Sequence, residues 1–501
     1  MGENENKNTY NHILKYTSIF GGVQVLNVLI GIARNKILAV MLGTEGMGLM
    51  ALLNSTVSFI SQATNLGLPI SAVRSLATYF NDGNEERIRR YIAVIRSWCF
   101  LAALLGMIIC ILAGPVLNAF SFSWGNHTLH FILLSPAVGM LAITGGETAI
   151  MKATRRLSQL AVIQLLSVFL IILITIPLVY FFGQSAIVPL IVSTALVSMC
   201  ATIVFSYRTY PLKKTSHKGI LKEGSGMVRL GLSFVVTAAF ASGADMAIRA
   251  FLNVEASLDI VGLYNAGIMI TLTYASLVFM AMETDYFPRL SAVSSDIEGL
   301  TDTVNKQAEV SILLLSPMLA ALMLLLPVLI PLLFSSSFSP AVSMAQASMF
   351  AMYLRAVALP VAYIALAKGD SLPYLLIESF YSVMLFVCVS VGFLIGGLVG
   401  AGLGVSVSYL IEFIGNLIFT RLRYGFSLKN QAWKYIFLQY PLGLLAYVAS
   451  LSPNPIINWT AGILIVVLSS VISISVFRKK TSLLDGLRRK YGNRAKQSAE
   501  E

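Results

Sequence analysis

Residues 156–207 read RLSQLAVIQLLSVFLIILITIPLVYFFGQSAIVPLIVSTALVSMCATIVFSY and contain two long apolar runs, 156–182 and 187–207, separated by the turn GQSA. An apolar run of about 20 residues is long enough for one helix to cross a bilayer. Similar runs recur along the chain, whereas the alternating ten-residue segments of an outer-membrane barrel are absent. The sequence therefore predicts an all-α polytopic membrane protein, whose helices satisfy their own backbone hydrogen bonds in lipid.

The composition excludes a soluble globular enzyme. Of 501 residues, 57% are apolar and 12% are charged, which is about half the charged fraction of a soluble domain. The formal charge of +12 is therefore interpreted loop by loop and not as a sign of nucleic-acid binding. The first residues, MGENENKNTY, lack the basic start of a cleavable signal, so the first span is expected to be a permanent anchor. No cofactor is expected.

The loop charges predict how the chain crosses the membrane. Fourteen spans are predicted near residues 16–42, 47–79, 91–113, 129–151, 156–182, 187–207, 227–252, 258–284, 309–335, 340–367, 372–396, 402–420, 433–450 and 456–477. Lys and Arg are absent from every second loop, namely 43–46, 114–128, 183–186, 253–257, 336–339, 397–401 and 451–455. The positive-inside rule places these seven loops outside and both termini in the cytoplasm.

An internal repeat is visible at the scale of six helices. ARNKILAVMLGTEGMGLM (33–50) is similar to IRAFLNVEASLDIVGLY (248–264). Three landmarks recur at an offset of 214 or 215 residues: Arg34 and Arg249, Gly48 and Gly262, and Arg74 and Arg289. An offset of six helices keeps both halves in the same orientation, which predicts a parallel repeat about an axis along the membrane normal.

The repeat predicts two pseudo-symmetric six-helix lobes that enclose a central cavity and rock to expose it to either side. The expected parts are an N-terminal lobe (1–207), a cytoplasmic linker (208–226), a C-terminal lobe (227–424), two extra helices (425–477) and a basic cytoplasmic tail (478–501).

Cationic residues lie inside the predicted spans, where an ionised group costs at least about 2.5 kcal/mol. Arg34, Lys36 and Arg249 fall in the outer thirds of their spans, Arg74 lies near the cytoplasm and Arg355 lies near mid-span. Together they predict a ladder of positive charge that favours a phosphorylated or carboxylated substrate, because guanidinium binds such groups bidentately. The alternative is that all of them except Arg355 snorkel to a surface or pair locally.

Acidic residues also occur at membrane depth, at Glu147, Asp245, Glu378 and Glu412. Glu378 and Glu412 lie at similar depths in adjacent antiparallel spans, where they are candidates to share a proton or a cation. Asp245 is a third candidate for ion coupling. The alternative is a structural role, in which Asp245 pairs with Arg249 one helical turn away.

Cysteine and histidine give no sign of a disulfide framework or a metal site. His127 and His130 lie three apart in the longest outward loop without a third ligand nearby, and we expect them to be solvated. All four cysteines fall in apolar runs and are expected to be core thiols: Cys99, Cys110, Cys200 and Cys388.

Several segments together resemble one family over nearly the whole chain. They are LGTEGMGLM (42–50), GLYNAG (262–267), YFPRLS (286–291), IALAKGDSLPYLLIES (364–379) and GGLVGAGLGVSVSYLIE (396–412). The chain resembles the polysaccharide-flippase branch of the multidrug/oligosaccharidyl-lipid/polysaccharide (MOP) exporter superfamily, and most closely O-antigen-type translocases.

The resemblance implies an alternating-access flippase in a bacterial inner membrane. Its cargo would be an undecaprenyl-diphosphate-linked oligosaccharide of O-antigen, and hence of lipopolysaccharide, or of a related polysaccharide. Arg34, Arg74, Arg249 and Arg355 would bind it, and Asp245 stands four residues from Arg249, where the family often has an adjacent Asp-Arg pair. Partners would be membrane lipids, a coupling H⁺ or Na⁺ and a polysaccharide polymerase. Fourteen spans also resemble the lipid II flippase branch, so a peptidoglycan precursor is an alternative cargo.

Two other functions are weighed against this one. A drug/cation antiporter is expected to have acids in place of arginines in its cavity. A membrane glycosyltransferase or polymerase needs catalytic residues in sizeable outward loops, but GPVLNAFSFSWGNHTLH (114–130) contains no Asp, Glu, Lys or Arg. No Walker A motif is present, and the sequence does not indicate an enzyme.

Overall fold

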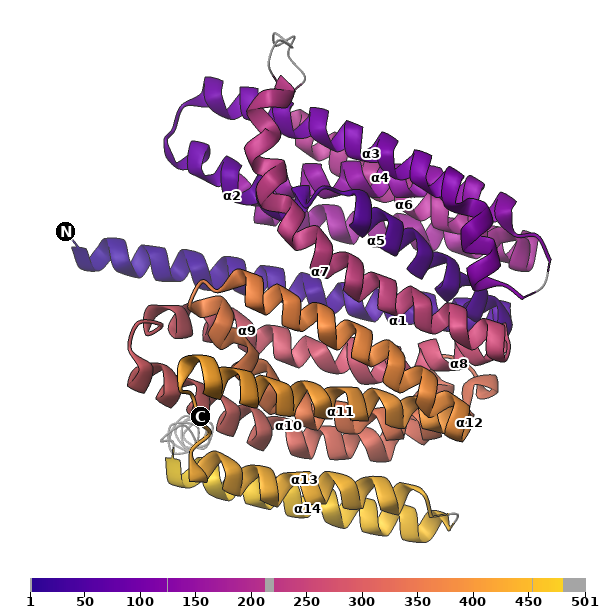
Figure 1. Cartoon of the computed structure of the whole chain (residues 1–501), viewed down its shortest axis with the longest axis vertical. Helices are drawn as coiled ribbons and strands as arrows, with labels where there is room; N and C mark the ends of the chain where they lie inside the picture. The colour runs from indigo at the N-terminus through magenta and orange to yellow at the C-terminus, as the bar shows by residue number, and fades with distance from the viewer. Residues whose placement is uncertain (1, 124, 212–219, 453, 481–501) are drawn as a thin grey trace, which may run out of the picture. The chain divides into compact units, whose positions relative to one another are not determined.

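The computed structural model describes residues 2–123, 125–211, 220–452 and 454–480. Most of the basic tail, and residues 212–219 of the predicted linker, lie outside them. The helices (Figure 1) are α1 (Gly2–Thr64), α2 (Leu68–Asn81), α3 (Glu85–Ser121), α4 (Thr128–Ala153), α5 (Leu157–Phe182), η1 (Gly183–Ala186), α6 (Ile187–Thr209), α7 (Ile220–Glu255), α8 (Leu258–Ile268), η2 (Met269–Tyr274), α9 (Ala275–Ala292), α10 (Ile297–Leu333), η3 (Ser336–Phe338), α11 (Ala341–Ala367), α12 (Ser371–Tyr424), α13 (Asn430–Ser450) and α14 (Pro455–Lys480).

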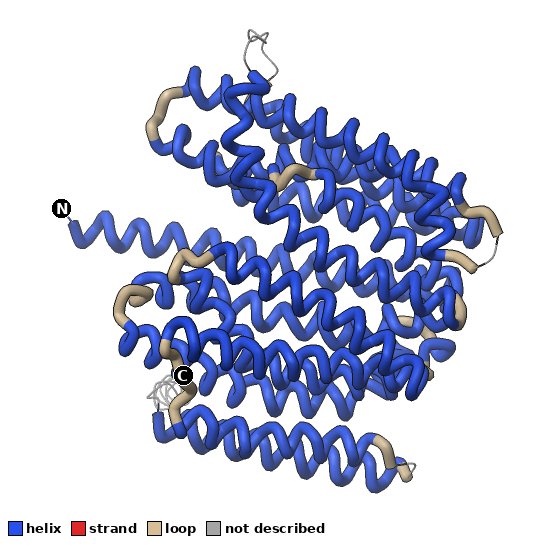
Figure 2. The backbone as a smooth tube through the Cα atoms, viewed as in Figure 1, coloured by secondary structure: helices blue, strands red, loops and turns tan. Residues whose placement is uncertain are grey.

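The predicted all-α membrane architecture is confirmed. Figure 2 shows only helices and short loops in the described part of the chain. Nine described stretches are long and apolar enough to cross a membrane, and two of them, Leu157–Thr209 and Ser371–Tyr424, each contain two of the predicted spans. Every predicted span lies largely within helix, so the chain is a multi-pass membrane protein.

Two of the predicted outward loops are kinks inside continuous helices. At Gly43 in α1 the backbone has φ 68° and ψ −169°, and at Gly397 in α12 it has φ 58° and ψ −142°. Glycine adopts positive φ without the steric penalty that a Cβ imposes. Each kink lets the chain turn back into the membrane with almost no loop, which is why spans 1–2 and 11–12 merge.

The prediction of one unbroken span over 47–79 is wrong. The helix stops at Thr64 and restarts at Leu68, and Leu66 and Gly67 have φ 55° and φ 66°. The Asn65 side chain accepts a hydrogen bond from the Gly67 N–H at 2.8 Å, so the break has a local partner for its backbone. The residues around the break, SQATNLGLP (61–69), include a glycine and a proline that are typical of a turn, so the sequence did carry a signal for it.

The chain divides into two compact units. The first unit comprises Met1–Ala266, Ile330–Ala341 and Leu372–Ser390, and the second comprises Gly267–Leu329, Val342–Ser371 and Val391–Glu501. In the first unit, an apolar core joins α2, α3, α4 and α7 through residues such as Leu76, Ile95 and Ile150. The division into lobes at residues 207 and 227 stays a prediction.

In the second unit, α13 and α14 lie side by side (Figure 1) and are joined by buried polar contacts. The Gln439 amide accepts a hydrogen bond from Ser469 at 2.7 Å and donates one to Ser473 at 3.2 Å. The α13 helix packs on α11, where the Tyr440 hydroxyl donates to the Tyr353 carbonyl at 2.8 Å. The two helices beyond the predicted repeat are therefore bound to the second unit and not merely tethered to it.

The turn between α11 and α12 carries an ion pair. Asp370 Oδ2 accepts hydrogen bonds from Arg423 Nε and from the Tyr424 hydroxyl, each at 2.9 Å. These two bonds, with Arg423 the larger cause, hold the pKa of the Asp370 carboxyl below its usual range. The turn is thereby fastened to the end of α12 within the second unit.

The expectation that all four cysteines are core thiols is only partly confirmed. Cys99 and Cys110 are buried, but Cys200 is exposed on α6 and Cys388 is half-buried on α12. In a membrane protein a helix is apolar on its lipid-facing side as well as on its packed side. An apolar run therefore does not show which side a cysteine takes.

Candidate functional site

Arg249 on α7 is a buried cation with an incomplete set of partners. Its Nη1 donates to the Asp245 backbone carbonyl at 3.0 Å, and its Nη2 donates to Asn265 Oδ1 on α8 at 3.0 Å. The Asp245 carboxylate forms an ion pair with it, as the local-pairing interpretation expected. Arg249 Nε is also buried but has no hydrogen-bond partner among the described residues. The side chain of Asp245 remains half-exposed, at 50%.

Arg34, the repeat counterpart of Arg249, lies on α1 in the same unit. Its Nε is buried without a hydrogen-bond partner in the described part of the chain. Its neighbour Lys36 does not snorkel, because Lys36 Nζ donates to the Pro331 carbonyl in the last turn of α10 at 3.0 Å. A cation there offsets the negative end of the α10 dipole. Of Arg34 and Lys36, Arg34 is therefore the one with a buried N–H that has no hydrogen-bond acceptor among the described residues.

The other two predicted arginines differ in environment. Arg74 is exposed on α2, and the alternative that it snorkels to the cytoplasmic surface stays a prediction. Arg355 is half-buried in the second unit. Its Nη1 donates to the Tyr409 hydroxyl at 3.3 Å, and its guanidinium lies 5.7 Å from the centre of the Phe279 ring. The Tyr409 hydroxyl and the Phe279 ring both stabilise the positive charge of Arg355.

The proposed pairing of Glu378 with Glu412 stays a prediction. Both side chains are half-buried on α12, on either side of the kink at Gly397. Glu378 belongs to the first unit and Glu412 to the second.

A buried ion pair that the sequence analysis missed joins α3, α4 and α6. Arg96 Nε and Nη2 donate to the two carboxylate oxygens of Glu147, at 2.8 and 3.2 Å. The Ser206 hydroxyl donates to the same carboxylate at 2.5 Å, and Arg96 Nη1 donates to the Tyr210 carbonyl at 2.9 Å. The guanidinium also lies 4.0 Å above the Tyr207 ring. Every strong donor and acceptor of the pair is engaged, which indicates a structural role.

A signal for this pair was present in the sequence. Arg96 is a single cation inside the predicted span 91–113, and Glu147 is a single acid inside the neighbouring span 129–151. Opposite charges in neighbouring spans are expected to pair, since each alone is costly in lipid.

His127 and His130 are stacked and not freely solvated as predicted. Both are half-buried, their ring centres lie 5.2 Å apart, and the His127 ring stacks on Phe122 at 4.1 Å. Their Nδ1 atoms lie 3.2 Å apart. Among the described residues, no group of three or more His, Cys, Asp or Glu side chains is arranged to hold a metal ion.

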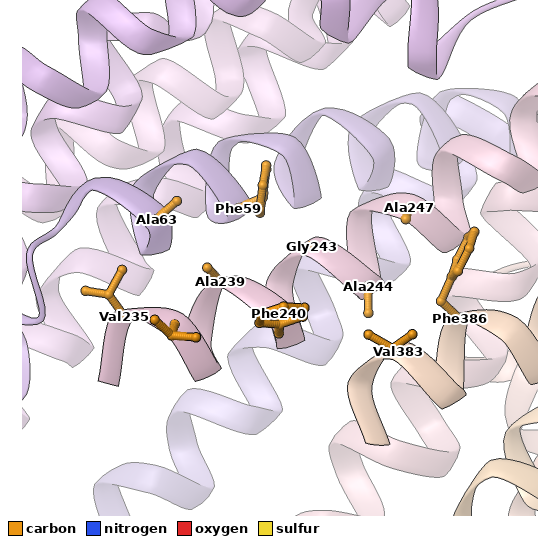
Figure 3. Close-up of a pocket in the computed structure, with 11 residues that line it drawn as sticks. Phe59, Ala63, Val235, Ala239, Phe240, Gly243, Ala244, Ala247, Val383 and Phe386 are labelled. Carbon is orange, nitrogen blue, oxygen red and sulfur yellow. The ribbon is translucent and has the colours of Figure 1, made fainter. Parts of the chain in front are cut away.

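An apolar cavity of about 500 Å³ lies in the first unit between α1, α7 and the first half of α12. Figure 3 shows Phe59 of α1, Phe240 of α7 and Phe386 of α12 around it, with the small residues Ala239 and Gly243 of α7 between them. Its lining contains no ionisable side chain. The cavity suits a hydrocarbon chain and not a phosphate or a sugar.

The charges of the first unit suit an anion. Arg34 and Arg249 each keep one buried N–H free of a hydrogen-bond acceptor among the described residues. A buried cationic donor without an acceptor is costly, and a phosphate oxygen would satisfy it. Because Arg249 is already paired with Asp245, an incoming anion must compete with that carboxylate or displace it.

Comparison with known proteins gives one family and one fold. The family model described as polysaccharide biosynthesis protein matches residues 37–343, more than half of the chain. No curated protein sequence matches the chain significantly. Similar solved structures include the lipid II flippase MurJ in an inward closed conformation, at 13% identity and a TM-score of 0.68, covering 92% of this chain and 99% of that one.

Two further structures share the fold. An inward-facing MATE family multidrug resistance transporter of the MOP superfamily has 16% identity and a TM-score of 0.67, covering 79% of this chain and 94% of the other. A MOP superfamily transporter from Pyrococcus furiosus, described by the reverse polarity of its binding pocket, has 16% identity and a TM-score of 0.55, covering 81% and 93%. At these identities the likeness shows the MOP transporter fold.

Proposed function

Because this chain belongs to the polysaccharide biosynthesis protein family and has the MOP transporter fold, we propose that it is a flippase for a lipid-linked oligosaccharide. The proposed cargo is an undecaprenyl-diphosphate-linked repeat unit of O-antigen or a related surface polysaccharide. It would move from the inner to the outer leaflet of a bacterial inner membrane by alternating access, and a polysaccharide polymerase would use it there.

The observation that carries the proposal is the pair of buried, incompletely bonded arginines, Arg34 and Arg249. A diphosphate offers several charged oxygens, and charge-assisted hydrogen bonds to arginine are among the strongest available in proteins. The sugars would follow the diphosphate along the path of cationic side chains, and the polyprenyl tail would stay in hydrocarbon. An inside-negative potential favours outward movement of the anion by about 2.3 kcal/mol per charge per 100 mV. Arg74 and Arg355 are proposed as further cationic positions along the path.

Lipid II is the second candidate cargo. The fold match covers 99% of MurJ, which is a lipid II flippase, and 92% of this chain. Both cargoes carry a diphosphate, so the arginine pair does not separate them. A drug/cation antiporter fits less well, because Asp245 is already neutralised by Arg249 and Arg34 adds positive charge to the same unit.

Deletion of the gene tests the function and the cargo together. We expect loss of a surface polysaccharide and accumulation of its diphosphate-linked repeat unit on the cytoplasmic side, both restored by the wild-type gene. Extracted lipid-linked oligosaccharide and surface glycan would be measured by mass spectrometry, and lipid II would be measured in the same extracts. Normal glycan and lipid II with increased sensitivity to cationic drugs would contradict the proposal and favour the antiporter.

The Asp245–Arg249 pair also suggests how an ion is coupled to transport. Binding of the diphosphate to Arg249 would release the half-exposed Asp245 carboxylate, which then takes up a proton or Na⁺. Only a ligand with different affinities for two states can shift them, so this uptake would bias the return step.

Neutralising the three candidate coupling acids tests this idea. For the triple variant Asp245→Asn, Glu378→Gln and Glu412→Gln, we expect slower transport that no longer depends on pH or Na⁺. The measurement is transport of a fluorescent lipid-linked oligosaccharide in proteoliposomes under imposed ion gradients. Unchanged transport with unchanged ion dependence would rule out coupling through these acids.

A further inference from the structure

Gln164 on α5 is an exposed amide on the packed side of its helix. The large exposed apolar side chains of α5 form one stripe, which consists of Val162, Leu166, Phe169, Leu173, Ile176 and Tyr180. Such a stripe faces lipid in a membrane protein. Gln164 lies about 200° around the helix from Val162, on the side of the buried positions Ser167 and Ile171, yet it is exposed. An amide without hydrogen bonds in hydrocarbon is costly, so Gln164 faces a water-accessible space on the inner side of α5.

Asn27 on α1 contacts Gln164 and keeps one atom open. Its Nδ2 donates a hydrogen bond to Gln164 Oε1 at 3.4 Å. Its Oδ1 is buried and has no hydrogen-bond partner among the described residues. An amide oxygen only accepts hydrogen bonds, so this atom requires an O–H or N–H donor and does not suit a phosphate.

Arg34 lies on the same face of α1 as Asn27. The two residues are seven apart, which is almost two turns, so their side chains project in nearly the same direction about 10.5 Å apart along the axis. Arg34 Nε needs an acceptor, whereas Asn27 Oδ1 needs a donor. A ligand that satisfies both is extended, with an anionic group at one end and hydroxyl groups at the other. A sugar attached to a diphosphate has this pattern.

The predicted repeat shows that the open amide occurs on one side only. Ser242 on α7 is the counterpart of Asn27, because 242 − 27 equals 249 − 34, the offset of 215 that relates Arg249 to Arg34. The Ser242 hydroxyl donates to the Ala238 carbonyl at 2.6 Å, within its own helix. The sugar end of an extended ligand would therefore lie at α1 and α5 and not at the counterpart position on α7.

We propose that Asn27 and Gln164 form a sugar subsite, which binds hydroxyl groups of the glycan while Arg34 binds the diphosphate. Asn27 Oδ1 accepts a hydrogen bond from one hydroxyl, and the exposed Gln164 amide donates to another. Both side chains are neutral, so they discriminate between glycans by the positions of their hydroxyl groups. All three residues belong to the first unit. The subsite rests on the proposed function, because it requires a glycan as cargo.

Removing each amide at nearly constant size tests the subsite. The variants are Asn27→Leu and Gln164→Met. The probes are the lipid-linked oligosaccharide extracted from the gene-deletion strain and undecaprenyl diphosphate without sugar. Binding to the detergent-solubilised full-length protein is measured by isothermal titration calorimetry. Each variant should bind the oligosaccharide lipid about threefold to tenfold more weakly, which is the effect of one lost neutral hydrogen bond, and should bind undecaprenyl diphosphate as the wild type does.

Two further variants calibrate this result. Arg34→Ala should weaken binding of both lipids, because the diphosphate is common to them. Gln431→Met removes an exposed amide on α13 in the second unit and should change neither affinity. Thermal unfolding separates binding from stability: since Asn27 Oδ1 has no partner to lose, Asn27→Leu should not lower the melting temperature.

The subsite would be overturned if the amide variants bound the oligosaccharide lipid as well as the wild type, or if they lost both lipids equally. A lower melting temperature with unchanged binding would assign the amides a structural role instead. A wild-type protein that binds neither lipid would reject the proposed function and the subsite with it. If Asn27→Leu does not fold, Gln164→Met decides alone, because its side chain is exposed.

Discussion

Replacing Arg249 with alanine is expected to reduce export of the lipid-linked glycan at least about tenfold. Hydrogen bonds to charged groups contribute about 1.5 to 3 kcal/mol each, and about 1.4 kcal/mol corresponds to a factor of ten. The change removes the cation and frees Asp245, a carboxylate that then repels the diphosphate. The measurement is the transport rate in proteoliposomes at equal protein amounts.

Three matched variants separate this effect from misfolding. Arg249→Lys keeps the charge but loses the planar fork, so we expect an intermediate rate. Asp245→Asn keeps the cation and should bind cargo at least as well as the wild type. Arg156→Ala removes an exposed cation next to α5 and should have no effect. Wild-type transport by Arg249→Ala would remove this residue from the binding site.

The largest effect on stability is expected at the buried pair of Arg96 and Glu147. The change Arg96→Met leaves the Glu147 carboxylate, 3% exposed, without its cation. Removing one partner of a buried ion pair costs about 3 to 5 kcal/mol, because the remaining charge stays buried and uncompensated. Detergent-solubilised protein should therefore unfold at a clearly lower temperature or denaturant concentration.

The double variant Arg96→Met with Glu147→Leu shows whether the loss comes from the orphaned charge. Replacing a buried ion pair by apolar residues of similar size is often close to neutral, so most of the lost stability should return. Arg89→Met is the control, since its ion pair with Glu85 is exposed and such pairs contribute little. Additive losses in the double variant would show that the two side chains do not act as a pair.

The sequence predicted the spans well but not the packing of individual side chains. Asp245 and Arg249 are one helical turn apart, so their pairing follows from helix geometry alone. By contrast, Cys200 was predicted to be buried but is exposed, and His127 was predicted to be solvated but stacks on Phe122. The polarity of a stretch of sequence does not reveal which neighbour each of its residues contacts. The pairing of Arg96 with Glu147 depends on α3 and α4 lying against each other.

The apolar runs, the loop charges and the repeat thus determined by themselves that the chain is a helical membrane protein of fourteen spans with arginines at membrane depth. These features follow from the cost of exposing charge and backbone to lipid, which acts on each segment separately. Only the tertiary structure decided that Arg96 meets Glu147 and that Asn27 meets Gln164. Those features depend on which helices pack together, because a contact between distant segments is a property of their shared geometry and not of either segment.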